Sequence, residues 1–240
     1  MVRVLKFDPS RLDAQPGDTP AYGVAEAAHY LRIPKATLRA WVAGQDNFRP
    51  VILAPRPAGP PLLTFVNLVE VHVLDALRRQ HHVSLPKVRK ALRYLARTMP
   101  RSKRPLAELD IRTDGFDVLV EQWGNLINAT RDGQLEMRHI LEAYLRRVER
   151  GPHGIPVRLY PFTRKRPHDL SPAEAFDEPR HIVIDPHVAF GRPTLAGTGI
   201  PTEVIAERYK AGESMDELAE DYDRSRPEIE EAIRCELAAA

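Results

Sequence analysis

Three neighbouring residues have side chains of the kind that read DNA. Lys35, Thr37 and Arg39 lie on what is predicted to be the exposed face of one short helix. Lysine and arginine pair with phosphates or with guanine edges, and threonine donates to a phosphate or contacts a thymine methyl group. The pattern favours DNA recognition. The alternative is an ordinary helical hairpin whose charges are merely solvated.

Two helices must position these side chains. In a helix-turn-helix, the first helix supports the second, which enters the major groove. The first helix needs a small residue where the two helices cross, and Ala27 or Ala28 supplies it. The second needs an apolar anchor on its inner face, and Leu38 and Trp41 have helical spacing for that role. The sequence therefore predicts a helix-turn-helix over residues 24–43.

A basic stretch follows this predicted head. Residues 76–107 contain ten lysines and arginines and no acidic residue. Neutralising several phosphates would give a strong, salt-sensitive affinity for DNA, and a solvated helix face is the alternative. Beside a helix-turn-helix, we favour contact with the DNA backbone. Beyond the three residues above, the candidate DNA contacts are Arg56, Arg78, Arg79, Lys87, Arg89 and Lys90.

The net charge of +2 hides a strong asymmetry along the chain. Residues 1–105 carry 18 Lys/Arg and 7 Asp/Glu, which gives +11, whereas residues 202–240 carry 5 and 12, which gives −7. A basic front indicates a nucleic-acid partner at that end. The acidic end is expected to face a basic protein or water.

Composition argues against several classes of protein. No run of about 18 apolar residues is present, so we expect no transmembrane helix and no membrane partner, and the start lacks the apolar stretch of a secretory signal. The single cysteine, Cys235, excludes an internal disulfide and a Cys-rich zinc finger and favours a cytoplasmic location. The histidines lack metal-ligand spacing, and Glu230 and Glu231 are expected to be solvated. We expect no enzyme, cofactor or metal site.

Apolar periodicity outlines the remaining elements. Residues 50–65 form two short apolar runs around a Pro/Gly-rich turn, which predicts a hairpin or wing, and helices are expected at 66–81 and 85–98. Residues 116–122 alternate between apolar and polar, and Asp132-Gly133 is a turn signal, so paired strands are expected there. A helix at 137–150 and a strand at 157–162 follow.

The last third of the chain is more regular. A short strand is expected at 182–184, then a Gly/Pro-dense loop at 190–201 that lacks the spacing of a phosphate-binding motif. Three helices are expected after it, at 202–210, 214–221 and 226–237, with a capping box from Ser214 to Glu217. The fold class is mainly α with small β elements (α+β). The predicted parts are an arm (1–20), a DNA-binding domain (21–105), an α+β middle segment (106–162), a linker (163–180) and a C-terminal domain (181–240).

The predicted head resembles the N-terminal module of the MerR family over roughly residues 21–98. The residues that carry the likeness are Tyr22, Ala27, Leu31, Thr37-Leu38-Arg39 and Trp41. The resemblance implies a winged helix-turn-helix that docks on an operator as a homodimer. The family's wing is usually rich in arginine, whereas residues 55–63 hold only Arg56 among prolines.

The C-terminal block resembles a small domain, long catalogued as being of unknown function, found in antitoxins of VapB-type toxin–antitoxin systems. The matching residues are Asp185-Pro186, Gly191-Arg192-Pro193, Gly197-Thr198, Ile200-Pro201, Gly212-Glu213-Ser214, Leu218 and Tyr222. The resemblance implies a three-helix, helix-turn-helix-like unit, and its net charge of −7 favours interaction or dimerisation over DNA binding. Gly199 departs from the family, which generally has arginine there; Arg192 is a candidate to replace that residue.

Together the two resemblances imply an antitoxin that represses its own operon and neutralises a cognate VapC-like (PIN-domain) ribonuclease toxin. Antitoxins of this type commonly place a basic residue near the toxin's carboxylates. The candidates here are Arg164, Lys165, Arg166 and Arg192. The main alternative is a stand-alone MerR-like transcriptional regulator whose C-terminal region senses a ligand or partner. A structural DNA-associated protein is a third possibility.

Overall fold

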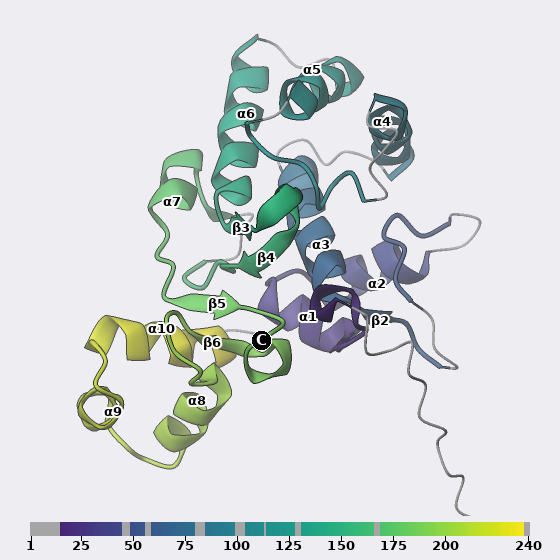
Figure 1. Ribbon diagram of the computed structural model, residues 1–240. Coiled ribbons are helices and arrows are strands. Elements are labelled where there is room, and N and C mark those ends of the chain that lie inside the picture. Colours follow the sequence, from purple (N-terminus) through teal and green to yellow (C-terminus); the bar gives the residue numbers. More distant parts are fainter. Residues whose placement is uncertain are drawn as a thin grey trace, which may run out of the picture.

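The computed structural model describes most of the chain. The described residues are 15–44, 49–55, 59–79, 85–98, 104–112, 114–127, 131–165 and 169–237. They form a mainly helical α+β structure, which confirms the predicted fold class (Figure 1). None of its helices has the length and apolar character needed to cross a bilayer, as far as the described residues extend.

The helices and strands are short. The α-helices are α1 (Val24–Tyr30), α2 (Lys35–Ala43), α3 (Phe65–Arg79), α4 (Leu85–Thr98), α5 (Asp114–Ile127), α6 (Arg131–Leu145), α7 (Pro172–Asp177), α8 (Thr202–Lys210), α9 (Met215–Tyr222) and α10 (Arg226–Leu237). The strands are β1 (Tyr22–Gly23), β2 (Leu62–Leu63), β3 (Val148–Arg150), β4 (Pro156–Leu159), β5 (Ile182–Ile184) and β6 (Pro193–Leu195). Single 3₁₀ turns lie at Pro16–Asp18, Pro152–Gly154 and Ala189–Gly191.

Helices α1 and α2 form the predicted helical pair. Ala27 is completely buried where the helices cross, and Leu38 and Trp41 are buried on the inner face of α2. Gly44 then ends α2 with a φ of +82°, a backbone angle that few residues other than glycine adopt without strain. The packing expected of residues 24–43 is therefore confirmed.

The two apolar runs after α2 do not pair as strands within the described residues, where one backbone hydrogen bond joins them, from the Leu62 N–H to the Pro55 carbonyl at 3.3 Å. Leu62–Leu63 instead pairs antiparallel with Tyr22–Gly23, so the second apolar run closes back on the start of the head. The first run lies against α2, where Val51 and Ile52 donate to the carbonyl of Trp41. The sequence could not reveal which segment Leu62–Leu63 pairs with, because the candidate segments are all short and apolar. The prolines between the two runs also lack the N–H that strand pairing requires.

The middle of the chain is helical where strands were expected. Residues 116–122 lie within α5, and Asp132-Gly133 lies in the first turn of α6. Phe116, Leu119, Val120 and Trp123 are all buried. Their spacing of three, one and three residues follows the helical period, whereas the alternation that suggested strands covered only part of the segment. Helix–helix packing therefore replaces the predicted strand pairing.

Gly124 allows α5 and α6 to pack closely. A Cβ atom at this position would lie 2.8 Å from the side chain of Gln134 on α6, so even alanine would force a displacement. Glycine within a helix is otherwise unfavourable. The close approach explains a residue that the sequence alone presented as a break.

A four-stranded sheet joins the middle of the chain to its C-terminal part. Its strand order is β3-β4-β5-β6, with every neighbouring pair antiparallel, and Leu159 pairs with Ile184 across the two parts. The segment predicted as a linker contains α7, and its Leu170 and Ala175 belong to the same buried cluster as the head and middle helices. The predicted domain boundaries stay predictions.

The C-terminal block has its own apolar core. Ile182, Leu195, Ile205, Leu218 and Ile229 pack together with side chains from α10. The three predicted helices are present, and Ser214 and Glu217 form the predicted capping box, with the Ser214 N–H donating to the Glu217 carboxylate at 2.8 Å. In Figure 1, α8–α10 lie at one end of the molecule and α4–α6 at the other, with α1 and α3 between them.

Candidate nucleic-acid interface

Helix α2 presents the three residues that were predicted to read DNA. Lys35 and Arg39 are exposed and Thr37 is half-buried, while Leu38 and Trp41 hold the opposite face in the core. Within the described residues, neither Lys35 nor Arg39 takes part in an ion pair, so both cations are available to a ligand. No side chain caps the start of α2, which leaves first-turn N–H groups that favour an anion.

Two of the other predicted DNA contacts have structural roles. The guanidinium of Arg78 on α3 lies 5.2 Å from the centre of the Trp41 ring and is half-buried, and this burial lowers its pKa. Arg89 on α4 donates to the backbone carbonyl of Arg49. Arg78 therefore supports α2 from behind, and Arg89 ties α4 to the segment that follows α2.

Helix α4 carries a row of exposed cations. Lys87, Lys90, Arg93 and Arg97 are exposed, while Val88 and Ala91 face the core. The helix contains no acidic residue that could neutralise them. Of the predicted set, Lys87 and Lys90 are therefore placed where a phosphate could reach them.

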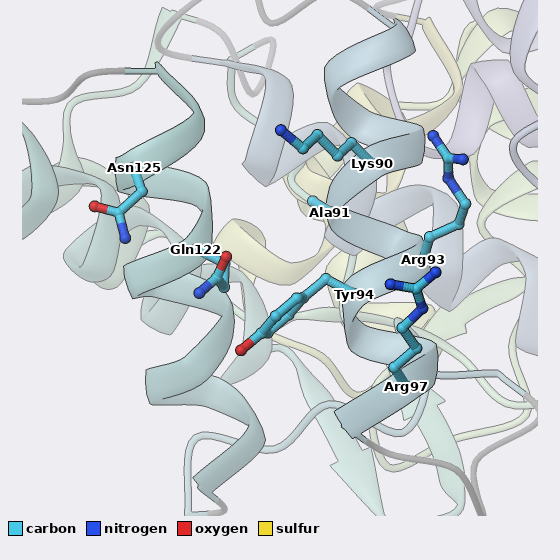
Figure 2. Close-up of a pocket in the computed structure, with 7 residues that line it drawn as sticks. All are labelled: Lys90, Ala91, Arg93, Tyr94, Arg97, Gln122 and Asn125. Carbon is cyan, nitrogen blue, oxygen red and sulfur yellow. The ribbon is translucent and has the colours of Figure 1, made fainter.

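A hollow of about 450 Å³ lies between α4 and α5. Figure 2 shows Lys90 and Tyr94 of α4 reaching toward Gln122 of α5, with Asn125 one turn further along α5. A cation, an aromatic ring and two amides facing one space are suited to a phosphate group and the ring beside it. Sequence reasoning missed Gln122 and Asn125, because residues 116–122 were interpreted as a strand; the helical spacing of Phe116 and Leu119 was the signal.

Three predicted contacts are not placed by the structure. Arg56 and Arg166 lie outside the described residues, and of Arg79 only the backbone, at the end of α3, is described.

The C-terminal block packs against the N-terminal helical head formed by α1 and α2. The Tyr22 hydroxyl donates to the carbonyl of Gly191 at 3.0 Å, although the two residues are 169 positions apart. Gly191 has a φ of +79°, and a Cβ there would lie 2.1 Å from the Tyr22 hydroxyl oxygen, so only glycine fits. Arg32, in the turn between α1 and α2, donates to the carbonyl of Arg234 on α10 at 2.8 Å.

Two of the predicted toxin contacts near residue 164 form ion pairs within the chain, although their own side chains are about half exposed. Arg164 pairs with the buried carboxylate of Glu231 at 2.8 Å, and Lys165 pairs with Glu174 at 2.6 Å. The expectation that Glu231 is solvated was wrong: its side chain is 2% exposed, and its carboxylate also forms an ion pair with Arg234. A buried carboxylate needs such partners, so Arg164 has a structural role.

Arg192 is also in an ion pair at the surface, somewhat more exposed than that of Lys165. It pairs with Glu203 at 2.8 Å, and both side chains are more than half exposed. An exposed ion pair contributes little to stability, because water competes for both charges. A partner protein could therefore exchange for Glu203 at small cost.

The buried titratable groups are structural. Burial lowers the pKa of His72 to about 4, and the ring lies against Tyr144 and Phe162 in the core. Burial raises the pKa of the Cys235 thiol to about 12. Across the part of the chain that is described, no three His, Cys, Asp or Glu side chains are grouped to hold a metal ion.

Comparison with known proteins gives two kinds of match. Residues 182–234 match a family model described as "Protein of unknown function (DUF433)". Over 90% of its length, the chain is 28% identical to a Mycobacterium tuberculosis protein named "Putative antitoxin VapB45", of which 93% is covered. It is also 26% identical to the uncharacterized protein Rv2308 of the same organism, with 90% of each chain covered.

The fold has a counterpart among solved structures. The crystal structure of Rv2018 from Mycobacterium tuberculosis superposes with a TM-score of 0.68 at 27% identity, covering 90% of this chain and 98% of that one. The arrangement of head, middle helices and C-terminal block is thus found in another protein. Over 90% of its length, the chain is also similar to a protein named as a putative antitoxin.

Proposed function

We propose that this protein is a DNA-binding antitoxin that represses its own operon and neutralises a cognate VapC-like ribonuclease. The observation that carries the proposal is the likeness, over 90% of the chain, to a protein named as an antitoxin, in a molecule whose second helix exposes Lys35 and Arg39.

The geometry of the head supports DNA binding. The inner face of α2 is held in the core by Trp41, whose ring is covered by Arg78, and its outer face is left to enter the major groove. The exposed cations of α4 extend the basic surface and would contact phosphates, which fix register without reading sequence. We propose that a homodimer binds two half-sites in this way.

A gel-shift titration with the DNA upstream of the protein's own coding sequence tests this half of the proposal. Arg39→Ala is expected to weaken binding by about 1–3 kcal/mol, because it removes a guanidinium that would pair with a base edge or a phosphate. Arg226→Ala is the matched control, since that exposed guanidinium lies on α10 and pairs with the exposed Asp216. Equal affinities for Arg39→Ala and the unaltered protein would refute the assignment of α2 as the recognition helix.

For toxin neutralisation, the support is the match of the C-terminal block to a family model together with the exposed Arg192. The test is co-expression with the product of the adjacent gene, followed by affinity capture and an RNA-cleavage assay. Capture that abolishes cleavage is the expected result. If the adjacent product is not retained while operator binding persists, the chain is better described as a stand-alone regulator.

A further inference from the structure

A single aromatic side chain projects from the C-terminal block into solvent. Phe190 is 94% exposed, far more than any other large apolar side chain of the described residues except Leu53 at 76%. A phenyl ring normally gains free energy by leaving water. A single exposed apolar side chain is common at protein surfaces, but here it coincides with an unusual backbone.

The backbone at this position is strained. Phe190 has φ = +57° and ψ = +29°, the left-handed region, and the preceding Ala189 has φ = +47°. Residues with a Cβ rarely adopt this region, and two in succession are rarer still. Such strain persists where the surrounding structure fixes it, and it is often found at binding sites.

The surrounding structure does fix it. Strands β5 and β6 pair on either side of the loop, with Ile184 opposite Pro193. Asp185 holds the base of the loop by accepting from the His187 N–H and from Arg158, both at 2.9 Å. At the other end, the Tyr22 hydroxyl binds the Gly191 carbonyl. Phe190 is thus displayed by a loop anchored at both ends.

We propose that Phe190 is the anchor by which this protein docks into an apolar pocket of its protein partner. Aromatic and arginine side chains dominate the binding energy of protein interfaces, and Arg192 lies two residues away, in an ion pair with the exposed Glu203. A pre-ordered loop loses little entropy on binding, which favours affinity. The expected pocket accepts a phenyl ring and has a carboxylate at its rim for Arg192. The inference rests on the proposed function, which supplies the partner: the adjacent gene's product.

Charge argues against a nucleic acid as the occupant. An aromatic wedge can enter DNA between base steps. However, residues 202–240, which follow this loop, carry a net charge of −7 and would repel a phosphate backbone. A protein partner is therefore the occupant that the surface favours.

The decisive variant is Phe190→Gly in the full-length chain. Glycine removes the ring and accepts a positive φ, so the thermal midpoint is expected to stay the same or rise. Affinity for the co-expressed adjacent gene product is expected to fall at least about tenfold. Phe190→Tyr, which keeps the ring, should retain binding. Ile155→Ala, which truncates another exposed apolar side chain at 52% exposure, is the control and should bind as the unaltered protein does.

Each outcome separates this inference from the function on which it rests. If Phe190→Gly binds the adjacent product as tightly as the unaltered protein, the anchor is refuted while the antitoxin function stands. If the unaltered protein does not retain that product, the antitoxin function itself fails. Phe190→Gly could instead retain the adjacent product but bind the operator more weakly, which would assign Phe190 to DNA binding. It could also retain the product but no longer form a dimer in light scattering, which would assign Phe190 to self-association. Either result would overturn the proposal.

Discussion

Arg147 offers the sharpest test of how the parts of the chain are held together. It follows α6 and is buried, and its guanidinium donates to four backbone carbonyls. These belong to Tyr160 at 2.6 Å, Pro161 at 2.8 Å, Glu178 at 2.9 Å and Pro179 at 2.8 Å. Since Glu178 and Pro179 directly precede β5, this one side chain ties the middle of the chain to the segment that leads into the C-terminal block.

The substitution Arg147→Met keeps an unbranched apolar stem, shortens the side chain and removes every donor. A hydrogen bond to a charged group contributes about 1.5–3 kcal/mol, so four of them have a gross value of about 6–12 kcal/mol. Burial of the cation opposes this, and its effect is visible in a pKa lowered to about 10. Because four carbonyls lose their donor, we expect a net loss of about 3–5 kcal/mol in the free energy of unfolding. That corresponds to a fall of roughly 6–20 °C in Tm for a chain of this size.

The assay is thermal and urea denaturation followed by circular dichroism. Arg146→Met is the matched control one residue earlier, where the guanidinium is exposed and only covers the Phe176 ring at 5.0 Å. That control should change stability by less than about 1 kcal/mol. If Arg147→Met costs no more than Arg146→Met, the four hydrogen bonds do not hold the two parts together, and the reasoning is refuted.

Three further predictions follow from the described groups. Lys90→Ala should reduce the slope of log affinity for DNA against log salt by about one, and an unchanged slope would exclude a phosphate contact there. Buried His72 is protonated only below about pH 4 in the folded chain, but below about pH 6.5 in the unfolded chain. The free energy of unfolding should therefore fall by about 2.5 kcal/mol more between pH 7 and pH 4.5 than it does for His72→Gln. An equal fall for the two proteins in urea denaturation would contradict this. Cys235 should resist a thiol reagent at pH 8 until urea unfolds the chain, because burial raises its pKa to about 12; rapid labelling of the native protein would refute its burial.

Much of the architecture was determined locally and could be predicted. The helices of the head and of the C-terminal block have strong apolar periodicity. Helices α2, α8 and α9 start after Pro34, Pro201 and Ser214, and α2 and α8 end at or just before Gly44 and Gly212. The capping box from Ser214 to Glu217 also depends only on residues three apart. Signals of this kind act within one or two turns of chain, so the sequence contains them in full.

The candidate site was predicted only in part. The exposure of Lys35 and Arg39 follows from the helical period of α2 and was foreseeable. The roles of Arg78 and Arg164 were not, because a cation that covers Trp41 or pairs with Glu231 looks in sequence like any solvated charge. Whether a charge is free depends on partners that are distant along the chain.

By itself, then, the sequence determined which short segments form helices and where the charge lies, with a basic front and an acidic end. Only the tertiary structure decided that residues 116–122 are helical, that Leu62–Leu63 pairs with Tyr22–Gly23, and that Phe190 stands exposed. Each of these outcomes depends on contacts between residues far apart in the sequence. A segment whose apolar pattern fits both a helix and a strand adopts the one that buries its apolar side chains against neighbouring elements. Phe190 is the converse case: long-range hydrogen bonds from Tyr22 and to Asp185 fix the ends of its loop, and the ring is left in water.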